Sequence, residues 1–142
     1  MEKKKVNLSL VVRFRDLDAL GHVNNSVYLT YFEEGRIEFS NLFFGQVTDT
    51  SSLNFIQAHV SCDYVKPVKI GNRVRLQIWV NKIGRSSFVF GIRLVDRTDE
   101  SIVYAKGKSV MVHYDFKKSC SIPLTDATKL FLSEYLDEEL TV

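Results

Sequence analysis

The amino-acid sequence predicts an α+β fold in which one long helix packs against an antiparallel sheet. Five segments, which begin near residues 6, 56, 74, 88 and 102, alternate apolar and polar residues with the two-residue period of a half-buried strand. One further segment, 26–44, instead has apolar residues at helical spacing. The connections between the last four strands are too short for crossover helices, so these strands should run antiparallel.

Length and composition limit the class of protein. A chain of 142 residues fits a single domain, 1–142, and its 45% hydrophobic and 25% charged residues are typical of a globular protein. No apolar run approaches the roughly 20 residues of a membrane span, and the basic start is not followed by the apolar stretch of a signal peptide. A net charge of +2 does not indicate a nucleic-acid partner. We therefore expect a cytoplasmic protein without a membrane span.

The first predicted strand, 6–14, leads into a loop rich in reactive groups. Loop 15–25 contains two carboxylates, an imidazole and two carboxamides. Gly21 permits a tight turn, and the helix that follows has three candidate N-caps: Asn24, Asn25 and Ser26. The start of a helix attracts oxyanions because its backbone N–H groups are free and its dipole end is positive. We interpret this segment as the active-site loop.

The predicted helix 26–44 has one apolar stripe, formed by Tyr28, Tyr31, Phe32, Gly35, Phe39, Leu42 and Phe43. Gly35 costs about 1 kcal/mol of helix propensity relative to Ala. We expect this cost to be offset by the close approach of another backbone, which a sheet wrapped around the helix would provide. Glu33 and Arg36, outside the stripe, have the i,i+3 spacing of an ion pair.

Four further strands and a short helix complete the expected order. A polar loop, 46–54, precedes strands at 56–64, 74–80, 88–94 and 102–114. After Pro123, Thr125 is the candidate N-cap of a helix that contains Ala127, Leu130, Phe131 and Tyr135. The two cysteines, Cys62 and Cys120, lack the spacing of a disulfide framework or a zinc site. We expect reduced thiols and no metal.

Several segments match a known pattern in order and spacing. They are Asp16-Leu-Asp18-Ala-Leu-Gly21-His22-Val-Asn24-Asn25, then Tyr28 and Tyr31-Phe-Glu-Glu-Gly-Arg36, then Tyr64-Val-Lys66-Pro67-Val, Gly71-Asn72 and Gly84-Arg85-Ser86-Ser87-Phe88. Together they resemble the hotdog-fold acyl-CoA thioesterases of the 4-hydroxybenzoyl-CoA thioesterase family. The resemblance implies a long central helix wrapped by a curved, antiparallel five-stranded sheet. It also implies a homodimer or a homotetramer with active sites at subunit boundaries, and no cofactor.

The resemblance implies that Asp18 is the catalytic carboxylate, either as a general base on water or as a nucleophile that forms a mixed anhydride. A lone Asp before a turn more often forms an Asx turn or a cap, and the complete loop pattern is what favours catalysis. The same match assigns the oxyanion donor to the backbone N–H of Asn25, whose carboxamide could also cap the helix. His22 either acts on water or the acyl chain, or packs the loop. We expect Asp16 to have a structural role. Glu33, on the helix, is the alternative candidate for the general base.

Coenzyme A carries phosphates, so its binding site needs cations. Arg85 with Ser86 and Ser87 matches the family's basic-serine segment, and Lys66 is a second candidate, although exposed Arg and Lys are also common on any surface. Tyr28 is a candidate substrate contact, unless it fills the core as stripe aromatics often do. The sequence therefore predicts an acyl-CoA thioesterase of lipid metabolism. The alternatives are an acyl-carrier-protein thioesterase and a non-catalytic acyl-binding hotdog module.

Overall fold

The computed structural model describes residues 3–45 and 54–140. The elements in this part of the chain are β1 (Val6–Leu10), a 3₁₀ turn η1 (Phe14–Asp16), α1 (Asn25–Phe44), β2 (Phe55–Tyr64), β3 (Val74–Ile83), β4 (Ser87–Asp96), β5 (Val103–Asp115), β6 (Cys120–Ser121) and α2 (Asp126–Ser133). The predicted loop 46–54 lies outside the described residues except for its last position. No described helix combines the length and the apolar character needed to cross a membrane.

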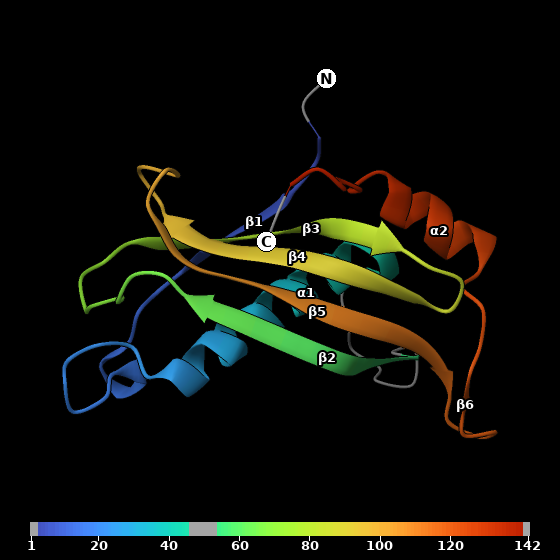
Figure 1. Ribbon diagram of the computed structural model, residues 1–142, viewed down its shortest axis with the longest axis horizontal. Coiled ribbons are helices and arrows are strands. Elements are labelled where there is room, and N and C mark those ends of the chain that lie inside the picture. The colour runs from blue at the N-terminus through green and yellow to red at the C-terminus, as the bar shows by residue number, and fades with distance from the viewer. Residues whose placement is uncertain (1–2, 46–53, 141–142) are drawn as a thin grey trace.

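The main sheet has the strand order β1-β3-β4-β5-β2, and every neighbouring pair is antiparallel. Figure 1 shows α1 running behind this curved sheet, with α2 at one end of it. The predicted fold class, a long helix wrapped by a five-stranded antiparallel sheet with a short C-terminal helix, is confirmed. The two-residue strand β6, which pairs with the end of β5, was not predicted. Its length is too short to show a period in the sequence.

The apolar stripe of α1 packs against the inward face of the sheet. Tyr28, Tyr31, Phe32 and Phe39 are between 0% and 4% exposed. They face the core with Val74, Leu76, Ile78 and Val80 of β3, which are each 0% exposed. The predicted stripe extends too far, because Leu42 is 51% exposed. Burial of these large side chains is the main favourable contribution to the fold.

Two glycines allow helix and sheet to approach closely, and a third makes room for a large side chain on the other face of the sheet. A Cβ at Gly107 of β5 would overlap the carbonyl oxygen of Ser61 on β2 and the ring of Phe32 on α1. A Cβ at Gly35 would overlap the side chain of Leu76. The sheet therefore fills the space beside Gly35 as expected, but with a side chain and not with the backbone that we predicted. On the other face of the sheet, Gly91 leaves room for the indole of Trp79.

The first strand is shorter than its sequence pattern suggests. It ends at Leu10, which pairs with Val74, the first residue of β3, so residues beyond this point have no partner strand. Phe14 begins the 3₁₀ turn and is 81% exposed. The prediction that the first strand continues as far as Phe14 is therefore wrong. The Asp16 carboxylate accepts the N–H of Arg13 at 2.9 Å and closes this turn. A local hydrogen bond thus replaces the missing strand partner.

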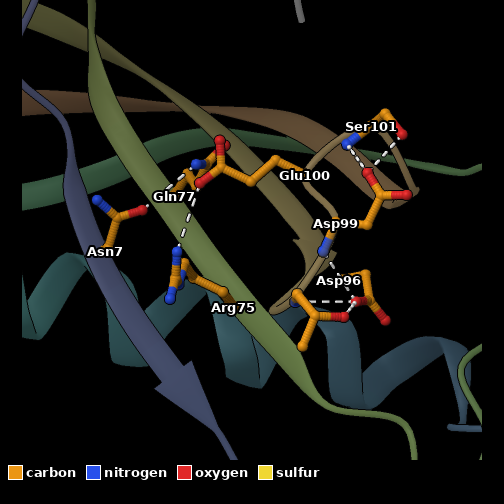
Figure 2. A network of polar contacts seen from close by, with 8 residues as sticks. Asn7, Arg75, Gln77, Asp96, Asp99, Glu100 and Ser101 are labelled. Carbon is orange, nitrogen blue, oxygen red and sulfur yellow. Dashed lines mark hydrogen bonds and ion pairs between the residues drawn. The ribbon is translucent and has the colours of Figure 1, made fainter.

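Polar side chains secure the turn between β4 and β5, as Figure 2 shows. Asp96 Oδ1 accepts the N–H of Thr98 at 2.9 Å, its hydroxyl at 2.7 Å and the N–H of Asp99 at 3.1 Å. These hydrogen bonds hold the pKa of Asp96 below its usual value. Nearby, Arg75 of β3 and Glu100 lie 3.4 Å apart. The connection is therefore fixed by its own side chains.

The short C-terminal helix begins as predicted. Thr125 is its N-cap, and the Thr125 hydroxyl accepts the N–H of Thr128 at 3.2 Å. After the helix, the chain returns to the sheet, where the N–H of Val80 donates to Tyr135 and the N–H of Asp137 donates to Val80. This segment continues the edge of the sheet beyond Val6, the first residue of β1.

We expect Gly107→Ala to be more destabilising than Gly35→Ala. The overlap at Gly107 involves backbone of the neighbouring strand, which cannot move away, and should cost about 3 kcal/mol of unfolding free energy. At Gly35 the Leu76 side chain is able to rotate, and Ala restores about 1 kcal/mol of helix propensity. Denaturant titration of both variants measures the difference. Equal midpoints for Gly107→Ala and the wild-type protein would show that the sheet tolerates a side chain there.

Candidate active site

The loop before α1 is held by its own backbone. The Asp18 N–H donates to the His22 carbonyl at 2.7 Å, and the Asn24 N–H donates to the Asp16 carbonyl at 2.8 Å. Gly21, at the tip, has a φ of 80°, which a side chain would disfavour. The N–H of Val23 donates to the carbonyl of Val68, which joins the loop to the segment between β2 and β3. The loop therefore has one defined shape directly before the helix.

Asp18 is held by one of its two carboxylate oxygens. Oδ1 accepts the N–H of Leu20 at 2.9 Å and the N–H of His22 at 3.3 Å. This is the Asx-type turn that a lone Asp in this position suggested. Within residues 3–45 and 54–140, no group donates a hydrogen bond to Oδ2. The turn thus positions the carboxylate and leaves one oxygen available to water or to a ligand.

The start of α1 offers a free backbone donor. Asn24, one of the three candidates, is the N-cap, and its Oδ1 accepts the N–H of Ser26 at 3.0 Å. The Asn25 carboxamide therefore does not cap the helix. In the described part of the chain nothing accepts the Asn25 N–H, while the Asn25 carbonyl accepts the Tyr64 hydroxyl at 3.0 Å. An oxyanion could bind at this N–H, because the helix start adds a favourable dipole.

Tyr28 and Tyr64 form the wall next to this helix start. Their rings meet edge to face with centroids 5.0 Å apart, and Tyr28 is 2% exposed. Burial raises the pKa of the Tyr28 hydroxyl, a hydrogen bond with the Val68 backbone lowers it, and the negative charge of Asp18 raises it further. Burial also raises the pKa of the neighbouring Cys62 thiol to about 11. Tyr28 is thus largely a core residue in this chain. Tyr64, which was part of the matching pattern but was not predicted as a site residue, borders the site.

Asp16 connects the loop to the helix. Its Oδ2 accepts the N–H of Arg13 at 2.9 Å and the hydroxyl of Tyr31 at 2.7 Å. Burial, and then the hydrogen bond to this carboxylate, raises the pKa of Tyr31. These contacts agree with the structural role that the sequence suggested for Asp16.

The predicted site residues lie at two ends of the molecule. Lys66 is exposed and precedes Val68, which contacts the loop, so it lies at the same end as Asp18, His22, Asn25 and Tyr28. The hairpin with Arg85, Ser86 and Ser87 follows the far end of β3, whose 10 residues span about 33 Å. Figure 1 shows this hairpin at the opposite end of the sheet. A single chain therefore does not bring these three residues to Asp18.

Metal-ligating side chains are not grouped in the described regions. Residues 3–45 and 54–140 contain no set of three or more His, Cys, Asp and Glu side chains that could hold an ion. The polar groups of the site are thus the Asp18 carboxylate, the loop and helix amides, and the hydroxyl of Tyr64.

We expect Asp16→Ala to destabilise the protein. The substitution leaves the buried hydroxyl of Tyr31 and the N–H of Arg13 without their acceptor, which should cost about 2–3 kcal/mol of unfolding free energy. Tyr31→Phe removes only one of these bonds and should cost about 1 kcal/mol. Denaturant titration of both variants measures these costs. An unchanged midpoint for Asp16→Ala would contradict the structural role.

Comparisons with known proteins agree with the fold and also identify a family. A thioesterase from Thermus thermophilus, solved in complex with coenzyme A and Zn, is 30% identical with a TM-score of 0.76, and the match covers 89% of this chain and 95% of that one. A Bacillus stearothermophilus protein described as a predicted thioesterase has a TM-score of 0.87 at 24% identity over 95% of this chain and 98% of that one, which shows the fold alone.

Among curated proteins, the uncharacterized protein YsmA of Bacillus subtilis is 26% identical over 118 residues, which are 83% of this chain and 78% of YsmA. A family model, the Thioesterase-like superfamily, matches residues 12–132, which include the loop, the long helix and all of the main strands except β1. The chain belongs to the Thioesterase-like superfamily.

Proposed function

We propose that the protein hydrolyses an acyl-CoA thioester to a carboxylic acid and free coenzyme A, as enzymes of the 4-hydroxybenzoyl-CoA thioesterase family do. The observation that carries the proposal is the arrangement around Asp18. One carboxylate oxygen is held by loop amides, the other is available, and the free Asn25 N–H begins the helix that follows. The coenzyme A complex of the 30% identical Thermus thermophilus thioesterase supports the choice of substrate.

In this proposal the thioester carbonyl oxygen accepts the Asn25 N–H. Negative charge develops on this oxygen when the carbonyl carbon is attacked, and a fixed N–H at a helix start stabilises it. As a general base, Asp18 takes a proton from water while the water oxygen attacks, and returns this proton to the coenzyme A thiolate that leaves. As a nucleophile, the carboxylate expels the thiolate directly, and water then hydrolyses the mixed anhydride. Both routes use the unpartnered Oδ2.

The other loop residues would support this reaction. His22 closes the turn through its backbone, which donates to Asp18 Oδ1 at 3.3 Å and accepts from the Asp18 N–H at 2.7 Å. Its imidazole is then available to orient water or contact the acyl group. Lys66, on the same end of the molecule, is suited to an anionic part of coenzyme A.

We further propose that the protein acts as a homodimer that pairs through β2, and that two such dimers form the tetramer implied by the family. β2 is an edge strand of 10 residues, FIQAHVSCDY, that contains neither Lys nor Pro. Exposed edges usually carry such residues to prevent pairing with another strand. A two-fold axis would pair β2 antiparallel with its copy and extend the sheet across both chains.

This pairing would unite the two groups of predicted site residues. Phe55, at the first end of β2, lies opposite His113 of β5, whose N–H donates to Ser86 at 2.8 Å. Tyr64, at the other end, contacts the start of α1 through the Asn25 carbonyl. Because antiparallel pairing sets the first end of one β2 beside the last end of the other, Arg85, Ser86 and Ser87 of one copy would approach the Asp18 loop of the second.

The first test is Asp18→Asn, which keeps the shape of the side chain and the Oδ1 acceptor. We expect kcat for release of free thiol from acyl-CoAs to fall by about 100-fold or more, because the amide is neither a base nor a nucleophile. The melting temperature should change by no more than about 2 °C. Full activity with an unchanged melting curve would overturn the mechanism, and no activity in the wild-type protein with any acyl-CoA would favour an acyl-carrier-protein substrate or a binding module.

The shared site can be tested by mixing two inactive variants. In an equal mixture of the two variants, half of the reassorted dimers will contain one chain of each kind. If Asp18 of one chain works with Arg85 of the other, each of these mixed dimers will contain one intact site. A mixture of Asp18→Asn and Arg85→Met chains, refolded together, should then recover about a quarter of the wild-type rate at low substrate concentration. No recovery above the sum of the separate variants, with mixed dimers confirmed by mass spectrometry, would place both residues in the site of a single chain.

A further inference from the structure

A second concave site lies beside the C-terminal half of α1, away from the Asp18 loop. It is a hollow of about 170 Å³ between α1, α2 and the sheet. Its walls are largely aromatic and include Phe39, Phe43, Phe55, Phe88, Phe90 and Phe131. This volume is below the roughly 300–1,000 Å³ of the sites that enclose drug-sized ligands. The hollow is thus suited to a short, mostly apolar group.

Arg36 is an unusual residue for the lining of such a hollow. Its side chain is only 14% exposed, and burial lowers its pKa. Within the described ranges, the acidic group near its guanidinium is Glu33, the alternative base of the sequence analysis, which also lines the hollow and whose own side chain is 62% exposed. The two groups are 3.9 Å apart, which is longer than a hydrogen bond. The guanidinium has five N–H donors, so this contact leaves most of its hydrogen-bonding capacity unused.

The hollow would be next to the reacting carbonyl in the proposed dimer. Phe55, which lines the hollow, is at the first end of β2, and antiparallel pairing sets that end beside Tyr64 of the second copy. In each chain Tyr64 contacts the start of α1, where the Asp18 loop ends. The hollow of one chain would therefore lie near the Asp18 loop of the other.

We propose that this hollow binds the acyl group and that Arg36 binds a carboxylate at its far end, so that the substrate is a short acyl-CoA with a terminal carboxylate. This proposal rests on the proposed thioesterase function. A wholly apolar acyl group would cover the guanidinium and leave its donors without partners, which is unfavourable in a low-dielectric site. A carboxylate accepts two parallel N–H bonds from a guanidinium and neutralises its charge. The phenylalanine walls would contact the methylene groups between the two ends.

The test compares hexanoyl-CoA with adipoyl-CoA, which have six-carbon acyl groups and differ in the terminal carboxylate. We expect the wild-type protein to have the higher kcat/KM for adipoyl-CoA by about tenfold or more. Arg36→Met keeps an unbranched, flexible side chain, although a shorter one, and removes the charge. It should lower kcat/KM for adipoyl-CoA by about 10- to 100-fold, mainly through KM, and should raise the value for hexanoyl-CoA or leave it within about threefold, because the apolar acyl group then no longer covers a guanidinium.

Arg97→Met is the matched control, because Arg97 is exposed in the turn between β4 and β5 and does not line the hollow. This substitution should leave kcat/KM unchanged for both substrates. An equal loss for both substrates in Arg36→Met would overturn the proposal, since Arg36 would then act on the coenzyme A part or on the fold. A wild-type preference for hexanoyl-CoA would also overturn it.

A direct binding measurement separates this proposal from the thioesterase function itself. If neither acyl-CoA is hydrolysed, calorimetric titration with monomethyl adipate, which keeps one free carboxylate, and with methyl hexanoate, which has none, still tests the hollow. Binding of monomethyl adipate that is tighter than that of methyl hexanoate and is lost in Arg36→Met would support the assignment of Arg36. Equal binding of both esters, or binding of neither, would contradict it.

Discussion

The close packing of α1 against the curved sheet is the constraint on which the rest of the structure depends. Phe32 fits beneath β5 because Gly107 has no side chain, and Leu76 of β3 fits against the helix because of Gly35. Interiors packed at this density have few alternative arrangements. The position of the helix start is therefore determined by contacts in the middle of the helix. Asp16, which bonds to Tyr31, then places the preceding loop relative to that start.

This packing gives the Asp18 loop a rigid support, but the loop lies at one end of the folded molecule. In the proposed mechanism, the loop amides and the helix start would supply fixed donors, and such donors stabilise developing charge without reorganisation. The hairpin with Arg85 and the aromatic hollow with Arg36 are associated with the opposite end of β2. In the proposed dimer each chain would supply the reacting carboxylate of one site and the binding groups of the other. The uncharged character of most of the β2 edge is the feature that makes such pairing favourable.

Much of the fold could be predicted because its signals are local. Alternation and helical spacing identified all five main strands and both helices, and Thr125 was correctly identified as a cap. The loop pattern singled out Asp18 by resemblance, and the role of Asp18 in catalysis stays a prediction. At Phe14 and Leu42 the sequence pattern continues, but Phe14 lies beyond the last paired residue of β1 and both side chains are exposed. Periodicity reports what a segment could bury and carries no information on whether a partner is present.

The sequence by itself determined the order of the elements, the turn glycines and the chemical groups of the loop, because these depend on residues close together in the chain. Only the tertiary structure decided that Asn24 caps the helix, that Tyr64 contacts the Asn25 carbonyl, and that Arg36 lines an aromatic hollow. It also decided that the hairpin between β3 and β4 lies at the opposite end of the sheet from the loop before α1. The physical reason is that burial and distance between remote residues follow from strand register and helix packing, neither of which a single segment encodes.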